Sequence, residues 1–353
     1  MKTIKALTII IAFAAVLIIP EIARAQKTVE KVLASREIKV ADFANLEIEH
    51  KFGQIICKNH DINVIKIKVT ARLETRDPAK AEKIFSRIEL QISGDDSKVK
   101  IKSDFSNKIL ARDENMSIDI EILMPENINL TIDHMFGNAV IGSLTGVASL
   151  SSSYGSLKAE NLQHTKNDIK VSFGNGSFGA INGGKLKVSY GDLVIENAEN
   201  IQINSEYSNA KITSAKRIIA QNEGGSFKAG KLETLELSTK FGDAEIGDLS
   251  QSLLVRNEYG SLKVNYIGTR FTSVELDNSF GSAALNFDKD ASFAFEARMS
   301  FCELKYPEKS ANMSEKVTTA FESSYKGKIG AAGSMAKAVI QSSYGNVDLK
   351  INK

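Results

Sequence analysis

The sequence contains little that would cross-link the chain or hold a metal ion. It has two cysteines, four prolines and no tryptophan among 353 residues. Cys57 and Cys302 lie far apart, no C-x-x-C pair accompanies them, and His60 near Cys57 has no further ligand beside it, so the sequence predicts no metal site. Spacing alone cannot establish the Cβ proximity that a disulfide needs, so pairing of the two cysteines remains an alternative. We favour two buried thiols.

The chain lacks a surplus of either charge once its first 25 residues are set aside. The formal net charge is +2, and residues 1–25 carry it through Lys2, Lys5 and Arg24 against Glu21. The remainder is formally neutral with both signs interspersed, which is unlike a nucleic-acid-binding protein. No basic cluster is present that would hold the chain on an anionic membrane. We expect neither nucleic acid nor an anionic membrane as a partner.

Long hydrophobic runs are also missing, apart from one at the N-terminus. Ala6–Ile19 is apolar except for Thr8, follows the basic head of the chain, and is short of the roughly 20 residues that span a bilayer. Ala23–Ala25 is a small-x-small cleavage site, so residues 1–25 read as a secretory signal peptide, with an uncleaved anchor as the alternative. No cysteine follows that could carry a lipid. We expect a protein exported through a Sec-type signal, either periplasmic, on the outer surface or secreted, with no stable membrane span after cleavage.

Signatures of catalysis are missing as well. The sequence has no H-E-x-x-H, G-x-S-x-G, Walker or calcium nonapeptide motif, and its four histidines share no metal-ligand spacing. We therefore predict no catalytic residue, metal or cofactor. The alternative is a β-helical lyase or hydrolase of acidic polysaccharides. Its candidate residues would be Glu196, Glu245, Glu258, Glu303, Arg256 and Arg298. Their scattered phases favour a solvated surface of mixed charge instead.

The chain does contain one short sequence motif, an aromatic residue usually followed by Gly, which repeats about every 20 residues. Gly224 keeps the phase where the aromatic is absent. A fixed period of this length is typical of a solenoid, in which each unit buries its apolar face only by stacking on its neighbours. The aromatic positions are Phe136, Tyr154, Phe173, Tyr190, Tyr207, Phe241, Tyr259, Phe280, Phe301, Tyr325 and Tyr344.

Each unit reads as two short strands joined by a corner at the Gly. Apolar residues alternate with polar ones at Leu186 and Val188, and again at Leu193 and Ile195, after a change of parity. This pattern fits a right-handed parallel β-helix of about twelve coils or an antiparallel hairpin array with Gly-x turns. A type II′ turn needs φ > 0 at the Gly position, yet three units have Ser208, Cys302 and Lys326 there. We favour the β-helix.

Stacking the coils would align equivalent residues into columns. The aromatic column is predicted to be core, and not a stripe on which carbohydrate stacks. Ser residues precede most of the aromatics, and Asn, Asp or Ser follow most of the glycines. At a coil spacing of about 4.8 Å these side chains are expected to hydrogen-bond along the stack.

The sequence divides into the signal peptide at 1–25, an N-terminal β-rich cap at 26–130 and the solenoid repeats at 131–353. In the cap, strands are predicted at Val64–Leu73, Ile88–Ile92, Val99–Ile101 and Ile118–Leu123, and an early coil at Leu46–Ile55. One helix is predicted, with Asp77 as N-cap, Pro78 at N1, and Ala81, Ile84, Phe85 and Ile88 on one face.

The C-terminal end carries no such cap in the sequence. Lys305–Val317 reads as a polar loop inserted between coils, and the unit from Ile340 to Ile351 appears last in the chain. An uncapped coil exposes strand edges. We therefore expect this coil to be covered by that loop or to support end-to-end homo-association.

Met124–Ile141 followed by Ser153–Lys158 resembles the bacterial "putative adhesin" family of unknown function, whose members carry serial x-G-[DSN]-apolar units after a proline-containing strand. The resemblance covers about residues 120–353. It implies an exported β-solenoid of the envelope or surface with no established catalytic residues, and it carries over no site residue. From the export signal, the phased repeats and the missing catalytic signatures we expect a non-enzymatic β-solenoid of the bacterial cell envelope with an adhesin-like binding or scaffolding surface, whose partner is an envelope or surface protein or a glycan. Aromatic residues stand here where many relatives have Ser, Thr or Asn.

Overall fold

The computed structural model describes residues 27–105, 114–331 and 333–352. The segment read as a signal peptide lies outside these residues. Within them, no helix is long and apolar enough to cross a bilayer.

The described chain is almost entirely β-strand. The elements are β1 (Lys27–Lys39), β2 (Asn45–Lys51), β3 (Ile55–Asn59), β4 (Val64–Thr75), η1 (Pro78–Lys80), α1 (Ala81–Phe85), β5 (Glu89–Gly94), β6 (Lys98–Asp104), β7 (Asn115–Met124), β8 (Asn129–Met135), β9 (Ala139–Ile141), β10 (Ala148–Ser153), β11 (Leu157–Leu162), β12 (Asn167–Ser172), β13 (Gly176–Ser189), β14 (Asp192–Glu206), β15 (Asn209–Glu258), β16 (Leu262–Ile267), β17 (Ser273–Ser279), β18 (Ala283–Phe287), β19 (Phe293–Ser300), β20 (Leu304–Lys305), β21 (Ala311–Thr318), β22 (Glu322–Ile329), β23 (Lys337–Ser343) and β24 (Val347–Ile351).

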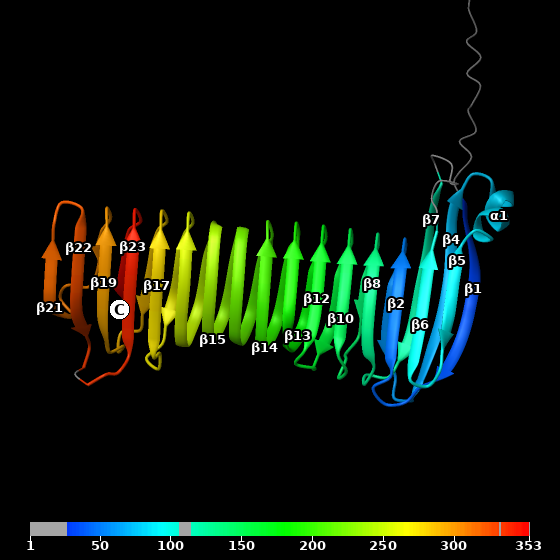
Figure 1. Ribbon diagram of the computed structural model, residues 1–353, viewed down its shortest axis with the longest axis horizontal. Helices are drawn as coiled ribbons and strands as arrows, with labels where there is room; N and C mark the ends of the chain where they lie inside the picture. The colour runs from blue at the N-terminus through cyan, green and yellow to red at the C-terminus, as the bar shows by residue number, and fades with distance from the viewer. Residues whose placement is uncertain (1–26, 106–113, 332, 353) are drawn as a thin grey trace, which may run out of the picture.

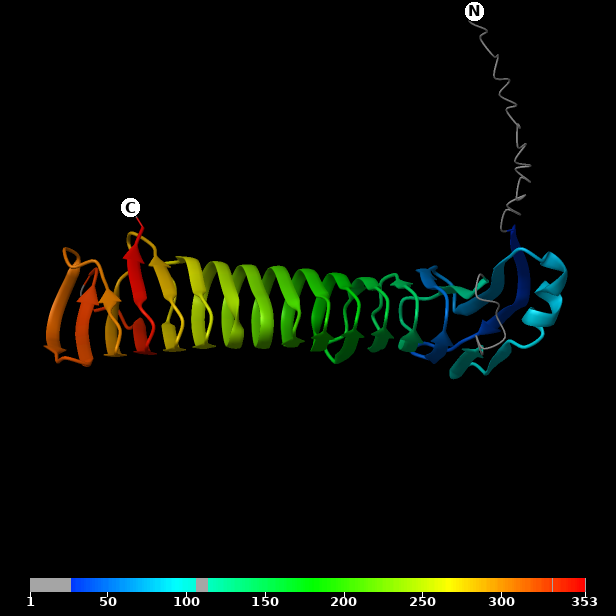
Figure 2. The same cartoon turned by 90° about the horizontal axis from the view of Figure 1, so that it is seen from above.

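The strands lie side by side along a straight rod (Figures 1 and 2). Equivalent residues of successive coils pair in parallel, as Ile169 of β12 does with Leu186 of β13, and Leu193 of β14 does with Ala210 of β15. Parallel pairing confirms the β-helix and excludes the hairpin array for the repeats. Antiparallel pairs between described strands occur only near the two ends, among β1, β4, β5, β6 and β7 and among β19, β21 and β22.

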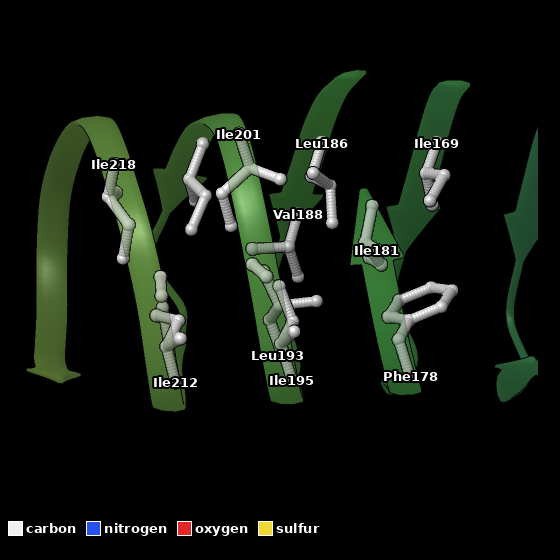
Figure 3. Close-up of a cluster of buried hydrophobic side chains, with 14 of the residues drawn as sticks. Ile169, Phe178, Ile181, Leu186, Val188, Leu193, Ile195, Ile201, Ile212 and Ile218 are labelled. Atoms are coloured by element: carbon white, nitrogen blue, oxygen red, sulfur yellow. The ribbon is translucent and has the colours of Figure 1, made fainter. Parts of the chain in front are cut away.

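The core is a continuous apolar column inside the coils. Leu186, Val188, Leu193 and Ile195 are buried, as the alternation of the sequence predicts, and they point between the two walls of the coil (Figure 3). Each stacks on its counterpart one coil away, so every coil buries apolar side-chain surface that its neighbours would otherwise expose to water.

The corner between the two walls has an unusual backbone. The aromatic residue adopts a left-handed conformation, with φ between +47° and +63° from Phe52 to Tyr344. In most coils a Gly follows, where the coils approach closely: a Cβ at Gly155 would lie 1.7 Å from the carbonyl oxygen of Gly137, whereas Ser208 and Cys302 stand at this position in two coils. The alternative hairpin turn requires positive φ at the Gly, whereas in these coils the residue with positive φ is the aromatic one.

The N-terminal cap matches most of its predicted elements. Strands β4, β5, β6 and β7 lie at the predicted positions. The Asp77 side chain accepts a hydrogen bond from the Ala79 amide at 3.3 Å, a short 3₁₀ turn follows, and α1 buries Ile84 and Phe85. The coil formed by β2 and β3 sits inside the rod, between β6 and β7 on one side and β8 and β9 on the other.

The C-terminal end corrects two predictions. Residues 311–318 are not loop but strand β21, which pairs antiparallel with β22. Tyr325 lies in β22, is buried and belongs to no coil, so Lys326 says nothing about the corner.

The last unit of the chain is not the last coil of the rod. Strand β23 lies between β17 and β19, and β24 between β18 and β20 (Figure 1). The premise that this coil ends the solenoid is therefore wrong, because β19 to β22 lie beyond it.

The two cysteines are unpaired and lie in coils near opposite ends of the rod. Cys57 is fully buried, and burial raises the pKa of its thiol to about 12. Cys302 is only half-buried, contrary to expectation, and its Sγ lies 3.3 Å from the Ser342 carbonyl oxygen.

Candidate binding surface

The aromatic residues form an exposed ladder along one edge of the rod, so the prediction of a core column is wrong. From Phe136 onward, the side chains are 42–60% exposed. Neighbouring rings stack with centroids 4.9–5.4 Å apart and planes within 15° of parallel. In spatial order this aromatic ladder is Phe52, Phe136, Tyr154, Phe173, Tyr190, Tyr207, Phe241, Tyr259, Phe280, Tyr344 and Phe301.

The left-handed corner explains why the rings point outward. Alternation along an extended strand would place Tyr190 on the same side as Val188. A residue with φ near +57° breaks that alternation, so the Tyr190 ring leaves the core. Ser189 before it donates a hydrogen bond to Glu206 of the next coil at 3.1 Å and is buried there. The spacing of the sequence identified the column, but its direction depends on a backbone conformation that L-residues rarely adopt.

Stacking decides which part of each ring a ligand can reach. An interior ring such as Tyr154 is covered on both faces, by Phe136 at 5.1 Å and Phe173 at 5.0 Å. Only its outer edge is open to solvent. The interior of the ladder therefore presents ring edges and tyrosine hydroxyls and cannot offer flat faces to a sugar.

A polar ladder runs beside the aromatic one, one residue after the Gly. Asn138 Oδ1 accepts from the Ser156 amide at 3.0 Å, and Asn175 Oδ1 accepts from the Asp192 amide at 3.1 Å. Asp243 accepts from the amide and hydroxyl of Ser261 at 2.9 and 2.6 Å, and these bonds lower the pKa of its carboxyl group. The predicted hydrogen bonding along the stack is confirmed for this column.

A second polar column, inside the coil, escaped the sequence analysis. It lies two residues before the aromatic, where Asn257 Nδ2 donates to Asn278 Oδ1 at 2.7 Å and to the Gly260 carbonyl at 2.8 Å. Asn278 in turn donates to Ser342 Oγ at 2.9 Å and to the Gly281 carbonyl at 2.7 Å. These side chains bridge the corner and link coils. The available signal was the recurrence of His, Ser, Thr or Asn two residues before most aromatics.

At the N-terminal end this column contains two buried histidines. The rings of His50 and His134 stack at 4.9 Å with planes 1° apart, and His50 Nδ1 lies 2.5 Å from Ser103 Oγ. Burial, and then the neighbouring His134, lower the pKa of His50 to about 3. Burial also lowers the pKa of His134. Both are thus neutral at physiological pH. The other two histidines, His60 and His164, each accept a hydrogen bond from the backbone amide two residues later at 3.1 Å.

The charged residues of the polysaccharide-enzyme alternative do not converge. Arg256 and Arg298 are exposed on strands before the corner, whereas Glu196 and Glu303 are exposed after it. Glu245 lies 3.7 Å from Lys228 and accepts from Asn265, so the pKa of its carboxyl group is lowered, first by that hydrogen bond. Glu258 pairs with Lys240 at 3.3 Å. Across the described ranges, no three His, Cys, Asp or Glu side chains form a group that could hold a metal.

An open groove of about 560 Å³ follows the opposite corner of the coils. Its floor contains Ala198, Ala215 and Leu232, and the Glu199–Lys216 pair, at 2.5 Å, lies on its rim. Tyr266 at one end donates to Asp288, and this hydrogen bond raises the pKa of the phenol.

Comparisons with known proteins point to one family. The Toastrack DUF4097 family matches residues 45–350. No curated protein matches the chain significantly. Among solved structures, a "putative adhesin" from Bacteroides fragilis is 13% identical, covers 92% of this chain and 98% of its own, and has a TM-score of 0.30. A "putative lipid binding protein" from Parabacteroides distasonis is 9% identical, with 92% and 96% covered and a TM-score of 0.28. A "putative cell adhesion protein" from Clostridium sporogenes is 10% identical, with 93% and 100% covered and a TM-score of 0.19. Because the family match spans most of the chain, the protein belongs to the Toastrack DUF4097 family.

Proposed function

We propose that this protein is a non-enzymatic binding or scaffolding rod of the bacterial cell envelope. It is exported by residues 1–25, and the edge of the rod that carries the aromatic ladder contacts an envelope protein or a glycan. The coarse part of this proposal, a binding protein and not an enzyme, agrees with the names given to the adhesin-like structures. The finer part rests on the surface of this chain.

The observation that carries the proposal is the exposed aromatic ladder. Large aromatic side chains dominate the energetics of binding surfaces, because they bury much area with few rotatable bonds. Rings that are 42–60% exposed in nearly every coil are a costly arrangement for a surface with no partner. Stacking fixes each ring in place before binding, so little side-chain entropy remains to be lost on association.

The binding part is tested by removing rings without disturbing the corners. Asn tolerates the left-handed conformation better than other non-Gly residues, so Tyr154→Asn, Phe173→Asn and Tyr190→Asn together preserve the backbone. Parent and variant are immobilised and exposed to envelope extracts and to a glycan array. We expect the triple variant to lose partners that the parent retains.

A matched control changes exposed residues away from the ladder, namely Glu160→Gln, Glu196→Gln and Lys211→Gln. This variant is expected to bind like the parent. Equal binding by all three proteins would show that the ladder is not the contact surface. Calcium-dependent cleavage of uronate-containing glycans by the parent would contradict the non-enzymatic proposal.

The export part has its own test. The full chain is expressed in a bacterial host, and the N-terminal residue of the protein in the envelope fraction is determined by mass spectrometry. We expect a mature chain that begins at Gln26. An intact N-terminus that stays with the inner membrane would instead support the uncleaved anchor.

A further inference from the structure

The aromatic ladder has one missing rung, at Gly224. Tyr207 and Phe241 stand on either side of it, two coils apart, so about 10 Å separates their ring centroids at a coil spacing of about 4.8 Å. Tyr207 is 60% exposed and Phe241 57%, against 53% for Tyr190 and 46% for Tyr259, their stacked neighbours. Each ring at the gap has a stacked ring on one side only.

The width of the gap corresponds to one aromatic ring. Rings in the intact ladder repeat every 4.9–5.4 Å, so a single planar group inserted midway would contact both free faces. Gly224 has φ +68°, close to the ladder aromatics, so the backbone at this coil presents the same outward direction without a side chain. An edge of the Tyr207 ring lies 3.1 Å from where a Cβ of residue 224 would be, so this ring leans toward the gap.

The charges around the gap favour a cation. Glu206 and Glu223 precede Tyr207 and Gly224 in the chain, and Asp243 follows the next corner. Glu206 pairs with Lys187 at 2.8 Å, whereas Glu223 forms no salt bridge with any residue of the described chain.

A second cation near the gap, Lys240, is also paired with a carboxylate. The Lys240 ammonium group lies 5.3 Å from the centroid of Phe241 and 3.3 Å from the Glu258 carboxylate. Aromatic faces carry negative charge density and attract cations, and the nearby carboxylates add to that field.

We propose that the gap at Gly224 binds one planar aromatic cation, inserted edge-first between Tyr207 and Phe241. This site does not depend on whether the ring edges of the ladder contact an envelope partner. It also differs from that contact in mode, because it uses two ring faces.

The probe is 1-methylquinolinium, with uncharged quinoline at pH 7.5 as its neutral counterpart. Binding to the parent protein is followed by calorimetry and by the proton NMR shifts of the probe. A ring held between two aromatic faces should show upfield shifts of its own protons. We expect one site per chain and binding at least several-fold tighter for the cation than for quinoline.

Three variants locate the site. Gly224→Phe supplies the missing rung, and φ at this position already suits a ladder residue, so the variant should fold and bind at least tenfold more weakly. Glu223→Gln should weaken binding of the cation and leave binding of quinoline unchanged. Phe173→Gly opens a matched gap between Tyr154 and Tyr190, where Ser153 and Ser172 stand in place of Glu206 and Glu223, and Asp192 stands in place of Asp243. It should add a second site whose preference for the cation is weaker than that of the gap at Gly224.

Circular dichroism melting of each variant establishes that it is folded. Undiminished binding by a folded Gly224→Phe variant would overturn the proposal, as would the absence of upfield shifts with the parent at millimolar probe. If Glu223→Gln weakens binding of the cation and of quinoline equally, the proposed preference for a positive charge is overturned.

Discussion

Every described corner of this solenoid except the one at Gly224 places an aromatic L-residue where glycine would be expected. A residue with a Cβ in the left-handed region costs about 1–2 kcal/mol. Stacking returns about 0.5–1.5 kcal/mol for each aromatic pair, and an interior ring has two such neighbours. The two effects are similar in size, so a ladder of mutually supporting rings offsets the strain that a lone ring would not.

This balance predicts an unusual order of stabilities at Tyr190. Tyr190→Ala removes both ring contacts but keeps a Cβ at φ +57°, so it should destabilise by about 1–3 kcal/mol. Tyr190→Gly removes the same contacts and also the strain, so it should be more stable than Tyr190→Ala by about 1 kcal/mol. Denaturant unfolding of the three proteins measures this. A glycine variant less stable than the alanine variant would show that the corner is not strained.

A second residue-scale prediction concerns the glycine that follows the aromatic. In Gly155→Ala the new Cβ would lie 1.7 Å from the Gly137 carbonyl oxygen, a backbone atom that cannot move aside cheaply. The coil spacing must open locally, and we expect a loss of about 3 kcal/mol or more. The matched control is Gly268→Ala, whose Cβ would meet its nearest neighbour at 3.6 Å. Its thermal melting should stay close to that of the parent.

The buried histidine pair predicts a loss of stability in mild acid. His50 has a pKa of about 3 in the folded protein, against 6.5 when it is unfolded and exposed. Below pH 6.5 the unfolded chain takes up a proton that the folded chain refuses, so stability present above pH 6.5 is lost as the pH falls toward 3. At pH 5 the loss from His50 is about 2 kcal/mol.

Urea unfolding between pH 7.5 and 5 checks this, because few carboxylates titrate in that window. His50→Asn with His134→Asn places a residue type used elsewhere in the same column and should flatten the dependence. A parent whose stability does not change between these pH values would contradict the burial of neutral histidines.

The sequence predicts residue spacing better than residue direction. Period-2 alternation correctly placed Leu186, Val188, Leu193 and Ile195 in the core. It failed for Tyr190, because alternation holds only while the backbone stays extended. Aromatic character also suggested burial, and nothing in one sequence distinguishes a ring packed in a core from one packed against identical rings outside it.

At the scale of elements, both ends of the rod are closed by the same device. One coil near each end lies between coils that are distant from it in sequence on at least one side, and antiparallel strands lie beyond it. Near the N-terminus, β2 and β3 form this coil; near the C-terminus, β23 and β24 do. The Asn278–Ser342 hydrogen bond, at 2.9 Å, joins two rungs 64 residues apart.

This arrangement predicts that the C-terminal segment is essential although it is terminal in sequence. Deleting residues 337–353 removes an interior coil and exposes both neighbours, including the positions that pack against Ala338, Ile340, Val347 and Leu349. Burial of side chains of this size is worth about 1.5–3 kcal/mol each, so several kcal/mol are lost. Deleting only Asn352 and Lys353 is the control.

Hydrogen exchange measures the effect. Amides of β17 to β22 should lose protection in the long deletion, while those of β10 to β14 keep theirs, because each coil depends on its neighbours. Unchanged protection of β19 and β22 would show that these strands are held without the inserted coil.

The elements were predicted where their signals are local. The Asp77–Pro78 start of the helix and the strands of the cap depend on residues that are neighbours in sequence. The insertion of β23 between β17 and β19 could not be predicted, because order along the chain is the default assumption for a solenoid and no local pattern marks the exception. The polar side chains of β21 predict a loop, although they also suit an edge strand.

At the scale of the whole molecule, each end of the rod presents two outer strands among those described. The short strands β5 and β20 pair only with β6 and β24, and the longer strands β1 and β21 pair only with β4 and β22, so each leaves one edge of backbone groups unpaired. Strands β1 and β21 carry charges of both signs, which hinder the addition of another chain. The chain otherwise has no large surplus of charge to keep copies apart, since its formal net charge is only +2. Separation of rods therefore depends on local charges at their ends.

The final prediction follows from the charges on β21. Glu315 pairs with Lys326 at 3.1 Å, and the Lys316 ammonium lies 5.8 Å from the Tyr306 ring and 5.9 Å from the Tyr325 ring. Glu315→Val with Lys316→Val would leave Met313 to Val317 as a largely apolar edge of high β-propensity, which favours edge-to-edge pairing. We expect concentration-dependent association in light scattering. Glu315→Gln with Lys316→Gln removes the same charges but keeps the edge polar and should associate far less. If the valine variant melts like the parent and stays monomeric at high concentration, the shape of the β21 edge, and not its charge, keeps the rods apart.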